Sequence, residues 1–173
     1  MSALAGPWTI VTGLLLLGGA LKAAHPSDTA RALEALGLPV SEPLVRAGGL
    51  AEVGIAAVAL ATGAWPFAAL VALSYLLFLA FVVAALRSKT PVSSCGCFGR
   101  ADTPPTFVHV VVNAAAAGVA LAAVVAPVPG FASIVSDQPG WGIPFLFLGV
   151  LGVYLVFLIL SALPRVFAES GAG

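Results

Sequence analysis

Charged residues are scarce in this chain. Of its 173 residues, 8% are Asp, Glu, Lys or Arg, while 61% are hydrophobic. A soluble domain carries about 25% charged residues, so this chain lacks the polar side chains that a water-facing surface needs. The seven basic and seven acidic residues balance to zero and form no basic run, which argues against nucleic acid as a partner. The composition therefore predicts a protein whose main partner is the lipid bilayer.

Motifs for ATP use, zinc proteolysis, haem attachment and nucleophilic hydrolysis are also missing from the sequence. The chain consists instead of long apolar runs separated by short polar connections. Each run is close to the roughly 20 residues that a helix needs to cross a bilayer, and lipid leaves the backbone of such a run no alternative to a helix. We therefore predict an all-α polytopic membrane protein, with residues 1–173 forming a single membrane domain. Its bundle has about five transmembrane helices, at about residues 7–24, 44–64, 67–86, 106–126 and 143–163.

The connection between the first two predicted spans is long enough to hold structure of its own. Ser27 and Asp28 are typical of a helix start, and Gly37 followed by Pro39 is typical of a helix end. Polar and apolar residues between them follow a helical spacing. We expect a short amphipathic helix that lies at the membrane interface.

Basic residues are distributed asymmetrically around these spans. With five spans, one side of the membrane receives all seven of them, namely Lys22, Arg31, Arg46, Arg87, Lys89, Arg100 and Arg165. Short cytoplasmic loops carry an excess of Lys and Arg, so this side is predicted to be cytoplasmic in a bacterial inner membrane. The three Trp residues fall near the other side, where they are expected in an interfacial aromatic belt: Trp8, Trp65 and Trp141.

The connection 87–105, on the basic side, holds the two cysteines of the chain, Cys95 and Cys97. Residues two apart lie near the Cα separation that a disulfide tolerates, and Gly96 allows the backbone angles between them. Such a small ring is strained and easily reduced, which favours thiol–disulfide exchange over a structural crosslink. The two thiolates also suit a soft metal such as Cu(I), Zn or Hg, and two free thiols without chemistry are a third alternative.

Four polar residues inside the apolar spans are the other candidates for a site. Lys22 ends the first span, and Glu52 lies about 10 Å into the second span from the same side. A carboxylate at that depth needs a partner or a proton, so we predict that it meets Lys22, either in a pocket beneath the cysteines or in an ion pair that fixes helix packing. His109 and Asn113 are four residues apart and share a helix face. His109 is a candidate catalytic residue that accepts a thiol proton, with a hydrogen bond inside the bundle as the alternative. Asn113 is a candidate pocket residue.

Together these residues resemble the MauE family of methylamine-utilisation membrane proteins, which is grouped with the DoxX-like proteins. The resemblance covers about residues 7–126 and rests on Lys22, Leu38-Pro39, Glu52 and the run Cys95-Gly96-Cys97-Phe98-Gly99 between two spans. It implies a redox-associated membrane protein in which the two cysteines cycle between dithiol and disulfide. Because MauE is linked to maturation of a disulfide-rich periplasmic dehydrogenase subunit, the implied partner is a thioredoxin-like protein or a membrane complex.

The predicted function is therefore a membrane-embedded thiol–disulfide redox component, a candidate thiol:disulfide oxidoreductase. A periplasmic partner and a cytoplasmic cysteine connection can be reconciled in two ways. Either electrons pass between a cytoplasmic thiol donor and a membrane quinone or second protein, or the connection faces outward. Two other classes stay open: a soft-metal binding or transport protein with Cys95 and Cys97 as ligands, and a non-catalytic membrane assembly subunit.

The charge pattern predicts which side of the membrane the cysteines face. We expect a membrane-impermeant maleimide added to intact cells to leave Cys95 and Cys97 unlabelled, before and after reduction, until the membrane is permeabilised. The variant with both cysteines replaced by serine measures background labelling. Labelling of intact cells after reduction would instead indicate a disulfide on the outer side and would overturn the cytoplasmic assignment.

Overall fold

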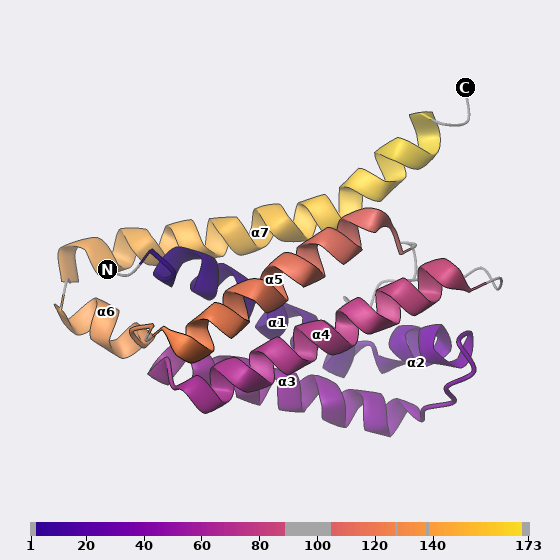
Figure 1. The fold of residues 1–173 in the computed structure, drawn as a ribbon, viewed down its shortest axis with the longest axis horizontal. Coiled ribbons are helices and arrows are strands. Elements are labelled where there is room, and N and C mark those ends of the chain that lie inside the picture. Colours follow the sequence, from indigo (N-terminus) through magenta and orange to yellow (C-terminus); the bar gives the residue numbers. More distant parts are fainter. Residues whose placement is uncertain (1–2, 89–104, 127, 138, 171–173) are drawn as a thin grey trace.

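The computed structural model describes residues 3–88, 105–126, 128–137 and 139–170, and this part of the chain is helical with no strand (Figure 1). Its helices, in chain order, are α1 (Ala5–Ala24), α2 (Pro26–Glu34), α3 (Glu42–Thr62), α4 (Trp65–Arg87), α5 (Phe107–Val125), α6 (Phe131–Asp137) and α7 (Pro139–Ser170). The predictions for Cys95 and Cys97 concern residues that lie outside the described part.

Five of the described helices are long and apolar enough to cross a membrane. They are α1, α3, α4, α5 and the segment Gly142–Ala162 of α7. This confirms the all-α polytopic class and the number of spans. The last of these segments agrees with the predicted span 143–163 to within one residue, but the helix itself extends beyond the span at both ends, because α7 begins at Pro139 and continues to Ser170. Proline is tolerated in the first turn of a helix, where its missing N–H has no intrahelical partner to lose.

The short helix predicted between the first two spans is present as α2. Its end is a Schellman motif, in which the Leu38 N–H donates to the Leu33 carbonyl at 3.0 Å and the Gly37 N–H donates to the Glu34 carbonyl at 2.8 Å. The motif requires a left-handed residue, and Gly37 has φ +76°. On the buried face of α2, Ala32 packs with Ala85 of α4. The helix thus lies against the bundle, and α3 starts where the chain returns from it.

Helix α1 is central to the bundle, because it contacts α3, α5 and α7. Trp8, at its start, is 2% exposed and belongs to the main apolar core. The prediction that Trp8 lies in an interfacial belt is therefore wrong, since neighbouring helices surround the first turns of α1. The Tyr75 hydroxyl of α4 donates to the Val11 carbonyl at 2.5 Å, which ties α4 to α1 in the same core. Trp65, by contrast, is 64% exposed at the start of α4.

Helices α1 and α3 are in close contact at two glycines, Gly19 and Gly49. A Cβ atom added to Gly19 would lie 2.7 Å from the Gly49 carbonyl oxygen, and one added to Gly49 would lie 2.7 Å from the Gly19 carbonyl oxygen and 2.8 Å from the Ala23 nitrogen. Backbone therefore packs directly on backbone, as small residues permit in membrane helix pairs.

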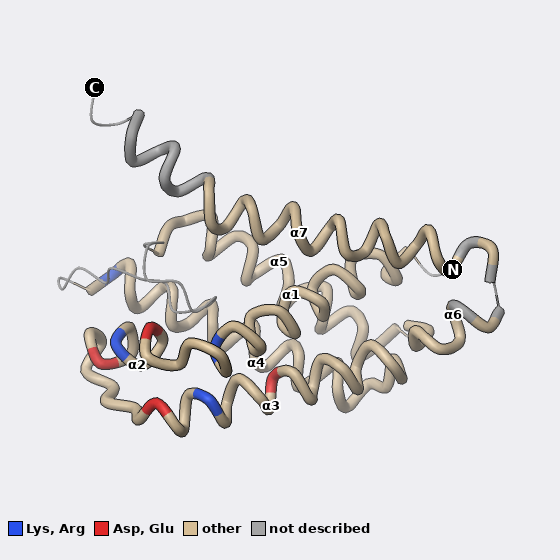
Figure 2. Tube along the Cα trace, turned by 180° about the vertical axis from the view of Figure 1, so that it is seen from behind, with Lys and Arg blue, Asp and Glu red and all other residues tan. Residues whose placement is uncertain are grey.

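Charged residues gather toward the end of the bundle where α2 lies (Figure 2). At this end α1 finishes, α3 begins and α4 finishes. Lys22 and Arg87 occupy the last turns of α1 and α4, where a cation also interacts favourably with the helix dipole. For the charged residues that the structure describes, the asymmetry of charge along the sequence is therefore an asymmetry between the two ends of the bundle.

The Gly19–Gly49 contact predicts that glycine-to-alanine substitutions in α3 differ strongly in their effect on stability, depending on position. We expect Gly49→Ala to lower the free energy of unfolding by about 1–3 kcal/mol, because the added methyl group meets backbone atoms that cannot move away. Gly54→Ala is the matched control on the same helix, since a Cβ there meets nothing within 4 Å. Unfolding in mixed micelles followed by circular dichroism measures both; equal stabilities of the two variants would contradict the close contact.

Candidate functional site

The contact between α1 and α3 places Lys22 beside Glu52. The Lys22 Nζ donates a hydrogen bond to Glu52 Oε1 at 2.7 Å, and Glu52 Oε2 lies 2.6 Å from the same nitrogen. Within the described residues the Oε2 atom is buried, and its polar contact is this ion pair with Lys22. The Lys22 side chain is 6% exposed and that of Glu52 is 16% exposed. The two charges thus form one compact, largely buried ion pair.

The position of this pair follows from the helices that carry it. Lys22 is three residues after Gly19, and Glu52 is three residues after Gly49, so each lies about one turn along its helix from the close contact. The Lys22 ammonium also lies 4.0 Å from the centroid of the Phe78 ring of α4. Helices α1, α3 and α4 therefore meet at the Lys22 ammonium group. Pairing and the aromatic face both reduce the cost of keeping that charge away from water.

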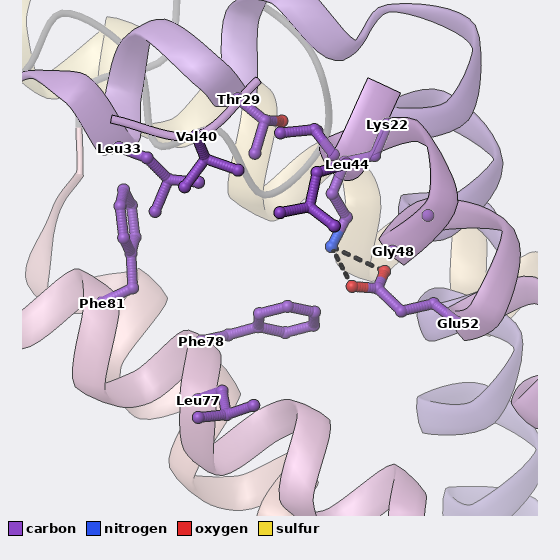
Figure 3. Close-up of a pocket in the computed structure, with 12 residues that line it drawn as sticks. Lys22, Thr29, Leu33, Val40, Leu44, Gly48, Glu52, Leu77, Phe78 and Phe81 are labelled. Carbon is purple, nitrogen blue, oxygen red and sulfur yellow. Dashed lines mark hydrogen bonds and ion pairs between the residues drawn. The ribbon is translucent and has the colours of Figure 1, made fainter. Parts of the chain in front are cut away.

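The ion pair forms part of the wall of a cavity of about 290 Å³ between α2, α3 and α4 (Figure 3). The other lining residues are mostly apolar. They are Thr29, Leu33, Val40, Leu44, Val45, Gly48, Gly49, Leu77, Phe78 and Phe81. Leu44 and Leu77, which line the cavity from α3 and α4, are 63% and 61% exposed. Since both helices are membrane spans, we place the mouth of the cavity at these leucines, facing the lipid.

His109 occupies a different position, at the start of α5. Its Nδ1 accepts a hydrogen bond from the Thr106 N–H at 3.3 Å and lies 2.9 Å from the Thr106 hydroxyl oxygen. With the Thr106 side chain these bonds form a capping box that begins the helix. The side chain is 1% exposed, and its Nε2 has no hydrogen-bond partner within the described segments. Because Nδ1 is an acceptor here, the neutral ring carries its proton on Nε2.

Asn113 lies one turn further along α5 and is buried. Its side-chain amide donates to the His109 carbonyl at 2.7 Å. Asn113 does not line the cavity with Lys22 and Glu52 but lines a separate, very small cavity of about 20 Å³ among α1, α4, α5 and α7. Phe78 lines both. The structure thus brings Lys22 and Glu52 together, and His109 with Asn113, as two neighbouring groups.

Sequence reasoning missed the aromatic residues of the cavity, Phe78 and Phe81. They are three residues apart and share a face of α4. Because α4 is apolar on all sides, however, the sequence does not show which of its faces points inward. Sequence reasoning also missed the part that α2 contributes through Thr29 and Leu33. For metals, the described residues contain no group of three or more His, Cys, Asp or Glu side chains that could hold an ion.

These observations define a class of protein: a polytopic membrane protein with an ion pair buried in the wall of a cavity that lies between two spanning helices and the short helix α2. The family model described as "Methylamine utilisation protein MauE" matches residues 2–126, which contain α1 to α5. The chain therefore belongs to the MauE family, which confirms the resemblance seen in its residues. Helices α6 and α7 lie beyond the matched part. No curated protein and no solved structure matches the chain.

The buried ion pair predicts non-additive effects of substitution. We expect Glu52→Gln to cost about 3 kcal/mol of unfolding free energy, because it leaves the Lys22 ammonium buried without its carboxylate. The double variant Lys22→Met/Glu52→Gln is expected to be more stable than Glu52→Gln alone, since no charge is left unpaired. Unfolding in mixed micelles measures this. The exposed Glu34→Gln in α2 is the control and should match the wild type, and additive losses in the double variant would contradict the coupling.

Proposed function

We propose that this protein is a membrane-embedded thiol–disulfide redox component of methylamine utilisation that supports the redox maturation of a partner protein. Cys95 and Cys97 are the exchanging pair. Family membership is the observation that carries the proposal, because the matched residues 2–126 include the Cys-Gly-Cys-Phe-Gly run. The arrangement of the helices supports it. The connection with the cysteines leaves α4 and enters α5 at the charged end of the bundle (Figures 1 and 2).

The disulfide of the partner protein is the only co-reactant that the exchange requires. The thiolate of one cysteine attacks a sulfur atom of a partner disulfide, a mixed disulfide forms, and the other partner sulfur leaves as a thiolate. The second cysteine then attacks the mixed disulfide, which yields a Cys95–Cys97 disulfide and a reduced partner. Two electrons pass to the partner in this direction, and the reverse sequence oxidises it. The strain of the small ring makes the Cys95–Cys97 disulfide easier to reduce, which favours the direction that oxidises the partner.

His109 assists this exchange as a hydrogen-bond donor in the proposal. Its Nδ1 is used by the helix cap, so the group left for a thiolate is the Nε2–H. A donor of this kind stabilises the thiolate, which is the reactive form of cysteine. The capping contacts fix the orientation of the ring, so His109 has a positioning role at the start of α5 as well. We further propose a bacterial inner-membrane location with the cysteines on the cytoplasmic side, as the distribution of basic residues favours.

Replacement of either cysteine tests the proposal. We expect Cys95→Ser and Cys97→Ser each to abolish disulfide exchange with a thioredoxin-like protein, because one thiol cannot complete the two-step reaction. The variant that keeps the attacking cysteine should accumulate a mixed disulfide, which non-reducing electrophoresis detects. His109→Gln should slow the exchange without abolishing it.

Two results would contradict this function. One is full exchange activity in either single-cysteine variant. The other is a wild-type protein that shows no exchange but binds Cu(I) or Zn stoichiometrically, with both cysteines required for binding. This result would favour a soft-metal protein. Ser93→Ala/Ser94→Ala, in the same connection, is the matched control and should leave exchange unchanged.

A further inference from the structure

The exchange proposed above, between the cysteines and a partner protein, does not use the cavity beside Lys22 and Glu52. The lining of this cavity is apolar except for one ion pair and Thr29, and two of its lining residues, Leu44 and Leu77, are exposed on membrane-spanning helices. Ligand sites commonly combine an apolar wall with a few polar groups that orient the ligand. The cavity is therefore suited to a molecule that arrives through the membrane.

The charges on the wall select a neutral ligand. Lys22 and Glu52 compensate each other at 2.6–2.7 Å, so the cavity offers no surplus charge to a phosphate or a carboxylate group. A phospholipid headgroup would also require the burial of its own charges, at a cost that this site does not offset. The matching ligand is uncharged and carries hydrogen-bonding groups.

Size and shape point to a ring. An apolar cavity of 150 Å³ holds one benzene molecule, a known case in an engineered protein, so about 290 Å³ accommodates a substituted or fused ring. Phe78 and Phe81 extend into the cavity from α4 (Figure 3). Aromatic side chains pack well against flat rings, by offset stacking or by edge contacts.

We propose that this cavity binds the ring of a membrane quinone, whose isoprenoid tail passes into the lipid between Leu44 and Leu77. The ammonium group of Lys22 has three N–H donors and can donate to a quinone carbonyl. The reduced ring carries hydroxyl groups, and the Glu52 carboxylate, whose side chain lines the cavity and is 16% exposed, can accept from one of them. The ion pair thus provides a partner for both redox forms of the ring.

In this proposal the quinone accepts electrons from the cysteine pair. That role rests on the proposed redox function, whereas the binding site itself does not. The overall reaction is balanced: the dithiol loses two electrons and two protons and becomes a disulfide, and the quinone gains them and becomes a quinol. Binding of the ring needs neither cysteine. The two proposals can therefore be tested separately.

The test uses the full chain with both cysteines replaced by serine, in lipid nanodiscs, and a photoreactive azido-ubiquinone as the probe. We expect labelling of peptides from α3 and α4 that saturates and that excess short-tailed ubiquinone prevents. Gly48→Leu places a bulky side chain at the cavity wall, because Gly48 lines the cavity and a Cβ there meets nothing within 4 Å. The affinity of this variant for the azido-ubiquinone should fall about tenfold or more, and a tenfold fall corresponds to a loss of about 1.4 kcal/mol of binding free energy.

Gly54→Leu is the matched control, since it adds the same side chain to the same helix, meets nothing within 4 Å at its Cβ and does not line the cavity. It should bind like the parent. Phe81→Ala, which removes one aromatic wall, is a second variant and should also bind more weakly. Equal labelling in Gly48→Leu and Gly54→Leu, or a phospholipid in the cavity that ubiquinone cannot displace, would overturn the quinone site. Saturable binding with no exchange activity in the wild type would instead refute the redox function and leave the quinone site standing.

Discussion

The contact of backbone on backbone at Gly19 and Gly49 is the constraint on which the site depends. In lipid there is little hydrophobic force to hold two helices together, so close packing and polar contacts must do so. Because neither glycine has a side chain, α1 and α3 come close enough for Lys22 and Glu52, one turn further along, to meet at 2.6–2.7 Å. A side chain at either glycine would separate the charges and expose each to the cost of burial without a partner.

The ion pair in turn connects the packing of the bundle with the cavity. Lys22 is held by Glu52 on one side and by the Phe78 ring on the other, so α1, α3 and α4 share one buried cation. Helix α2 covers this region through Thr29 and Leu33. The same residues that stabilise the bundle therefore also line the cavity. A structural role of the ion pair is thus compatible with a role in ligand binding. A ligand that uses Lys22 and Glu52 would exploit an arrangement that folding already requires.

His109 fixes the start of α5, the helix that follows the connection with the cysteines. Its side chain begins α5 by closing the capping box with Thr106, and its carbonyl accepts from Asn113 one turn later. The start of α5 is therefore fixed by buried hydrogen bonds at the place where the chain returns from the connection. In the sequence His109 was a candidate for accepting a thiol proton, but the cap uses Nδ1 and leaves the Nε2–H, which changes the proposed role from acceptor to donor.

The sequence by itself determined the class of protein, the number of spans, the short helix α2 with its stop at Gly37, and the pairing partner of Glu52. These follow from local properties: composition, the length of apolar runs, turn chemistry and the cost of a charge in lipid. Only the tertiary structure decided which faces of the spans meet. Along a run that is apolar on all sides, no periodicity marks the inward face. For this reason the burial of Trp8, the part of Phe78 and Phe81 in the cavity and the separation of Asn113 from Glu52 became known only once the helices were packed.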